Sequence, residues 1–150
     1  MYEYLIAFFG LLVGGVIAYF TKEELKDGEK YFIWISRLLL LILGINFLVL
    51  GFNWWLALIG LVIGFFIHYE YLFLGLSGNV FSLSLVFIYG LFKGSLVWFK
   101  EKNRVYLINC LLFFIPMVLV ILFGLDLVSL AGGGCFGVVV RKFWKKGLLN

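Results

Sequence analysis

Residues 106–125 of the chain read YLINCLLFFIPMVLVILFGL and contain no charged side chain. A helix of about 20 apolar residues matches the roughly 30 Å hydrocarbon core of a bilayer. Backbone amides have no water to bond with in lipid, so helices and closed barrels are the two structures that cross it. This run does not alternate between apolar and polar residues as a barrel strand does. The segment therefore predicts a membrane-spanning helix.

The composition extends this interpretation to the whole chain. Hydrophobic residues make up 65% of the 150 residues, and charged residues make up 13%. Soluble domains are roughly half apolar and roughly a quarter charged. The polar residues are too few to cover a globule in water, and the hydrophobic content excludes a disordered chain. We therefore expect an all-α, polytopic transmembrane helix bundle that forms a single integral membrane domain over residues 1–150.

The apolar runs between the charge clusters predict about six helices. The expected helices are residues 2–20, 31–51, 54–71 (or on to 76), 80–99, 106–125 and 127–140. The last run rises only about 21 Å as a helix, which is short of the bilayer core, and it contains Ala131-Gly-Gly-Gly134. A thin spanning helix is the favoured interpretation of residues 127–140. A broken or re-entrant element is the alternative, and it would leave five helices.

The polar connections predict local structure and orientation. Thr21-Lys-Glu-Glu24 has the form of a capping box, so a short surface helix is expected to begin there and to end at Gly28. With six crossings, the Lys100–Arg104 loop and the C-terminal tail share one side and carry seven basic residues, against three in the Lys22–Lys30 loop. Basic loops stay cytoplasmic, so both termini are predicted to be cytoplasmic.

Four GxxxG spacings predict where helices pack closely. They are Gly10/Gly14, Gly60/Gly64, Gly90/Gly94 and Gly133/Gly137. Small residues allow the backbones of membrane helices to approach one another. We expect these pairs to form packing grooves within one chain. The alternative is that Gly10 and Gly14 form the seam of a homo-oligomer.

A few polar residues inside the apolar runs form the candidate intramembrane site: Lys93, Glu70, Arg37, His68 and Asn46. An ionisable residue at membrane depth is costly and points to function. Lys93 is the strongest candidate because it lies well inside its segment. Its structural interpretation is a partner for Glu70 or for helix-end carbonyls, and its functional interpretation is a charge that binds an anionic group or lines a transport path.

The same counts argue against several kinds of chemistry. One His and two Cys, Cys110 and Cys135, are too few for a zinc site of three or four such ligands, and no metal or cofactor is predicted. The basic residues flank apolar spans, so the net charge of +4 does not indicate nucleic-acid binding. Gly75-Leu-Ser77-Gly78 matches the GxSG of rhomboid-type intramembrane proteases, but no His follows Ser77 to act as its base. No catalytic residue is predicted, and these counts favour a protein without enzymatic activity while leaving an enzyme as an open alternative.

Three functions remain open from the sequence. The first is a subunit or scaffold of a membrane assembly, which fits the lack of catalytic groups. The second is a small oligomeric transporter or channel that uses Lys93, Glu70 and Arg37. The third is a lipid-handling enzyme in which His68 or Glu70 moves a proton while Lys93 and Arg37 hold a phosphate. The expected partners are membrane lipids and either further copies of the chain or another membrane protein.

Overall fold

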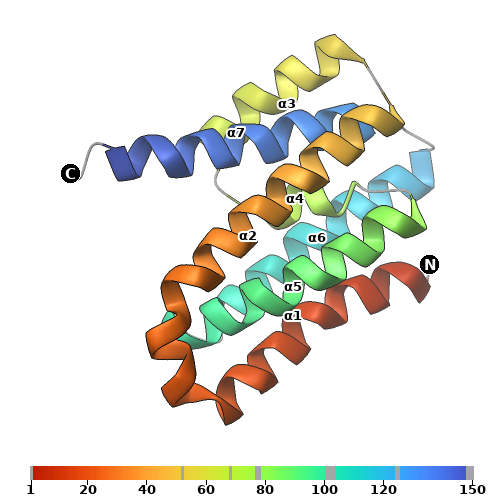
Figure 1. The fold of residues 1–150 in the computed structure, drawn as a ribbon. Coiled ribbons are helices and arrows are strands. Elements are labelled where there is room, and N and C mark those ends of the chain that lie inside the picture. Colours follow the sequence, from red (N-terminus) through yellow and green to blue (C-terminus); the bar gives the residue numbers. More distant parts are fainter. Residues whose placement is uncertain are drawn as a thin grey trace.

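A computed structural model describes residues 2–51, 53–67, 69–76, 79–100, 104–123 and 126–147. These residues form helices and no β-strand (Figure 1). The helices are α1 (Tyr2–Phe20), α2 (Lys22–Leu50), α3 (Trp54–Phe66), α4 (Glu70–Leu74), α5 (Val80–Lys100), α6 (Arg104–Phe123) and α7 (Val128–Gly147). The prediction of an all-helical chain is confirmed.

Four of these helices are long and apolar enough to cross a membrane. They are α1, residues 28–50 of α2, residues 80–97 of α5 and residues 105–123 of α6. The helix α3 is apolar but has only 13 residues. These helices support a membrane protein, while the expected total of about six crossings stays a prediction.

The second expected helix begins earlier than the sequence indicated. The helix α2 starts at Lys22 and continues through Gly28, so the separate surface helix does not form. Lysine and glutamate are good helix formers, and a single glycine costs only about 1 kcal/mol inside a helix. The Thr21 hydroxyl donates to the Ile17 carbonyl at 3.0 Å and makes no capping bond to α2. The expected capping hydrogen bond from the Thr21 side chain is therefore wrong.

The glycine-rich sixth segment is one continuous helix. The helix α7 has 20 residues, runs from Val128 to Gly147 and includes the glycines at 132–134 and 137. At 1.5 Å per residue it is about 30 Å long. The broken alternative for residues 127–140 is therefore wrong, because the helix is continuous across the glycines, and it extends about two turns beyond Val140.

The third segment is where the chain reverses direction, and the single helix expected over residues 54–71 is wrong. At one end, the Asn53 amide donates to the Ser129 hydroxyl near the start of α7 at 2.8 Å. At the other end, Arg141 donates to the carbonyl of Phe65 at 3.1 Å, so α3 runs parallel to α7. Along α4 the order is opposite, because Glu70 meets Lys142 whereas Phe73 lies against Gly134.

Two contacts explain why the helix stops at Phe66. Ile67 and Tyr69 are extended, with ψ of 111° and 100°. The Arg141 guanidinium donates to the carbonyls of Phe65 and Phe66, which a helix end leaves without partners. The reversal also places Glu70 beside two ammonium groups, so the chain is stabilised on both sides of the break.

The GxxxG spacings lie in two facing pairs. Gly10 and Gly14 of α1 face Gly90 and Gly94 of α5, and Gly60 and Gly64 of α3 face Gly133 and Gly137 of α7. At each position an added Cβ would collide with a backbone atom of the facing helix. The α1 glycines are thus covered by α5, and a homo-oligomer seam through them would require α1 to leave α5.

The helix directions bring most of the helix ends that are rich in lysine and arginine to one end of the bundle. The helices α1, α5 and α7 end there, and α2 and α6 begin there (Figure 1). We call this the basic end, because helix-terminal Lys22, Lys100, Arg104, Lys145 and Lys146 belong to it. The first residues of α1 and the starts of α3, α5 and α7 lie at the opposite end (Figure 1).

Candidate functional site

Glu70 lies at the centre of an ion cluster formed by three helices. It is the first residue of α4 and is only 4% exposed. Its carboxylate oxygen Oε1 lies 3.4 Å from Lys93 Nζ of α5 and also accepts a hydrogen bond from Lys142 Nζ of α7. One carboxylate therefore joins two ammonium groups from helices distant in sequence.

Burial of the residues that follow Glu70 fixes the carboxylate in this position. Tyr71, Phe73 and Leu74 have no exposed surface, and the Tyr71 ring lies 6.1 Å from that of Tyr89 on α5. A short helix with few hydrogen bonds depends on this packing for its stability. Burying an unpaired carboxylate costs several kcal/mol, so the two lysine contacts of Glu70 offset the free-energy cost of its burial.

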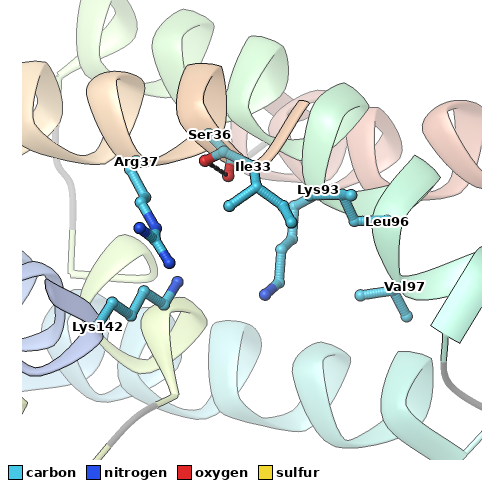
Figure 2. A pocket seen from close by; sticks show the side chains of 7 residues that line it. All are labelled: Ile33, Ser36, Arg37, Lys93, Leu96, Val97 and Lys142. Atoms are coloured by element: carbon cyan, nitrogen blue, oxygen red, sulfur yellow. Dashed lines mark hydrogen bonds between the residues drawn. The ribbon is translucent and has the colours of Figure 1, made fainter. Parts of the chain in front are cut away.

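A cavity of about 200 Å³ lies beside the ion cluster. Its lining comes from α2, α5 and α7: Ile33, Ser36, Arg37, Lys93, Leu96, Val97 and Lys142. Figure 2 shows the charged ends of Arg37, Lys93 and Lys142 directed into the same space. We call Arg37, Lys93 and Lys142 the cationic triad.

The Arg37 side chain is held by a ring and still has a free donor. Its Cζ atom lies 5.3 Å from the centroid of the Phe143 ring, which is a cation–π distance. Its Nη1 atom is buried and has no hydrogen-bond partner in the part of the chain that the structure describes. The neighbouring Ser36 hydroxyl donates to the Ile33 carbonyl at 2.9 Å, so its proton is already used.

The structure brings together three of the residues proposed from the sequence and separates a fourth. Lys93 and Glu70 are in contact, and Arg37 lines the same cavity as Lys93. Asn46 accepts a hydrogen bond from the Ser82 hydroxyl at 2.7 Å, which links α2 to α5. Ser82 is eleven positions before Lys93 on α5, so this link lies roughly 16 Å from the triad. His68 and Ser77 lie outside the described residues.

Sequence reasoning missed Lys142. It belongs to the charged run after Val140, which looks like a membrane-flanking tail. The spacing of Lys142 did indicate that it lies on the buried face of its helix. The i, i+3, i+4, i+7 pattern of one helix face is followed by Cys135, Val138, Val139 and Lys142. The first three of these are buried, and Lys142 continues their face towards Glu70.

The donors at this site suit anions. Ammonium and guanidinium groups offer only N–H donors, so they bind oxyanions and not metal cations. Within the described ranges, no three His, Cys, Asp or Glu side chains lie together as a metal site would require. Cys110 and Cys135 are both free thiols.

No protein-family model, curated protein or solved structure matches the chain. The fold and the site themselves define its class: an all-helical protein that has, in its described residues, four membrane-length helices and a cationic cavity between α2, α5 and α7.

Proposed function

We propose that the chain is a small membrane transporter or channel for an anionic solute, and that the cavity lined by the cationic triad is its solute-binding site. The observation that carries this proposal is the charge of the cavity. Arg37, Lys93 and Lys142 line it. Among the described residues, one carboxylate pairs with this triad: Glu70, which contacts Lys93 and Lys142.

A purely structural ion cluster would be balanced in charge. Charges at membrane depth are costly when they have no partner. The cavity instead has three cations for one carboxylate, and Arg37 Nη1 has no described partner. An anion that enters the cavity would supply the missing acceptor and neutralise the excess charge.

The break between α3 and α4 also favours transport. Membrane transporters commonly place substrate sites at discontinuous helices, where irregular backbone lines a cavity. Here the chain reverses between the end of α3 and the start of α4, and this reversal places Glu70 beside Lys93 and Lys142. An approaching anion would compete with Glu70 for both lysines, which gives the cluster a way to change its pairing.

The position of the basic end supports an orientation. We propose that the basic end is cytoplasmic, in line with the positive-inside rule. If α7 also crosses the membrane, the chain crosses five times. The unit formed by α3 and α4 then enters the membrane from the side opposite to the basic end and returns to that same side. The C-terminus is then cytoplasmic and the N-terminus is not. This proposal replaces the expectation that both termini are cytoplasmic.

The transport proposal is tested by anion jumps on proteoliposomes adsorbed to a solid-supported membrane. Currents are recorded for phosphate, sulfate, acetate and chloride with the wild type and with Lys93→Gln. Lys30→Gln is the control, since Lys30 is an exposed lysine of α2 outside the cavity. We expect at least one anion to give a current that Lys93→Gln abolishes and Lys30→Gln retains. Equal currents in both variants, or none above empty liposomes, would contradict the proposal.

A subunit or scaffold remains the second candidate. The two tightly packed pairs α1–α5 and α3–α7 favour it, because they make a rigid bundle without any need for a ligand. In that role the ion cluster serves packing alone. Lys93→Gln would then lower the melting temperature, no anion current would be seen, and another membrane protein would co-purify with the chain.

A further inference from the structure

The lining of the cavity points to a chemical class of ligand. We propose that the cationic triad binds a phosphoryl group, either on a free solute or on the headgroup of an anionic lipid. This proposal rests on the proposed function, because it names the anion that the cavity takes.

The first argument is the number of charges. The triad carries three positive charges, and the one described carboxylate in contact with it is Glu70, which pairs with Lys93 and Lys142. Two positive charges therefore have no described counter-charge. A phosphate monoester carries a charge of about −1.5 to −2 near neutral pH. A carboxylate carries one negative charge and would neutralise only half of the excess.

The second argument is the number and geometry of the acceptors. A phosphoryl group presents three strong acceptor oxygens, and each oxygen can accept more than one hydrogen bond from the triad. The planar guanidinium of Arg37 matches two phosphate oxygens at once, while a lysine acts as a point charge. Phe143 stacks on this guanidinium and leaves Nη1 without a described partner. Arg37 is therefore the residue that recognises the phosphoryl group.

The third argument is the apolar part of the lining. Ile33, Leu96 and Val97 complete the wall next to the charged groups. A volume of about 200 Å³ exceeds what a phosphoryl group alone fills, since one water occupies roughly 30 Å³ of liquid. The apolar wall fits a short organic segment attached to the phosphate, as both a small ester and a lipid headgroup provide.

The test is isothermal titration of the detergent-solubilised full chain with inorganic phosphate, acetate and dihexanoyl phosphatidic acid at one ionic strength. Dihexanoyl phosphatidylcholine is the control lipid. We expect phosphate or phosphatidic acid to bind and acetate not to bind. Arg37→Gln loses a charge-assisted hydrogen bond to the ligand, so we expect its affinity to be about tenfold or more weaker. We expect the affinity of Lys30→Gln to be unchanged. Arg37→Lys keeps the positive charge but loses the planar guanidinium that bonds two oxygens at once, so we expect about tenfold weaker binding in this variant too. It replaces Arg37→Gln in the test if that variant fails to fold.

The outcomes separate the two sources and the two proposals. Tighter binding of phosphatidic acid than of phosphate assigns the group to a lipid headgroup, and comparable binding assigns it to a free solute. Equal, Arg37-dependent binding of acetate and phosphate would overturn the phosphoryl proposal and leave anion transport standing. If no titrant bound in an Arg37-dependent way while anion currents persisted, the phosphoryl proposal alone would fall. If binding and currents were both absent, both proposals would fall.

Discussion

Glu70 on α4 accepts a hydrogen bond from Lys142 on α7, 72 positions later in the chain. The bond exists because the chain reverses after Phe66 and because α7 continues past Val140 as a helix. The reversal after Phe66 and the extension of α7 were both absent from the predicted series of spanning helices, and together they form the contact at Glu70. The second ammonium, from Lys93, completes a cluster that borders the cationic cavity.

The first prediction concerns the carboxylate of this cluster. Glu70→Gln removes the negative charge that pairs with two partly buried ammonium groups, those of Lys93 and Lys142, and leaves them only a neutral amide oxygen. Breaking a buried pair by removing one partner costs about 3–5 kcal/mol, so we expect a clear fall of the melting temperature in detergent. Glu3→Gln is the matched control, since Glu3 is exposed and should change stability by no more than about 0.5 kcal/mol. Equal melting temperatures for the two variants would show that the cluster does not stabilise the fold.

The same cluster predicts a partial rescue. Adding Lys142→Met to Glu70→Gln removes one of the unpaired charges and keeps an apolar stem of similar length. Replacing buried ions by apolar groups is often neutral or stabilising. We expect the double variant to melt above Glu70→Gln alone. Additive losses in thermal unfolding would indicate that the two side chains do not interact.

A third prediction concerns the glycine packing between α3 and α7. A Cβ on Gly64 would collide with the backbone of Gly134, so Gly64→Ala should separate the helices and destabilise the chain by about 1–3 kcal/mol. Gly28→Ala is the matched control, because its Cβ would lie 3.6 Å from the Phe32 ring, an ordinary contact. The control should be neutral or stabilised by up to about 1 kcal/mol through helix propensity. Thermal melts in detergent measure both, and a neutral Gly64→Ala would refute the close approach.

The end of α3 gives a fourth prediction. Arg141→Met removes the donor to the carbonyls of Phe65 and Phe66, so these carbonyls at the end of α3 lose a hydrogen-bond partner. We expect faster hydrogen exchange of the amides at residues 63–67, including Ile67, whose amide donates to Ile63 at 2.7 Å. Exchange in α1 should be unaffected. Unchanged protection at residues 63–67 would show that Arg141 is not what ends the helix.

The sequence was informative where periodic apolar runs met charged boundaries. The helices α1 and α5 follow the predicted ranges closely, because an apolar run between charges has one low-cost arrangement in lipid. The reversal after Phe66 had no such signal, since residues 67–69 include neither glycine nor proline. It depends on Arg141 and Lys142, which contact the third segment only in the folded chain.

The sequence likewise predicted some residues of the candidate site and not others. Lys93, Glu70 and Arg37 stood out because ionisable groups are rare inside apolar runs. Lys142 was hidden in a charged run at a helix end, where lysines usually reach the interface. Asn46 stood out for the same reason as Lys93, but its hydrogen bond to Ser82 serves helix packing away from the cavity.

The proposed site requires that the unit formed by α3 and α4 enters the membrane and returns to the side where it began. Asn53 and Asn79 are exposed residues at the two ends of this unit. Each is replaced by cysteine in a Cys110→Ala background, with Cys135 retained because it is fully buried. Oriented vesicles are then labelled with a membrane-impermeant maleimide, and Lys30→Cys reports the basic end. We predict that Asn53→Cys and Asn79→Cys label from the same side, opposite to Lys30→Cys. Labelling of Asn53→Cys and Asn79→Cys from opposite sides would show that the third segment crosses the membrane, and it would contradict the arrangement that joins Glu70 to Lys93 and Lys142.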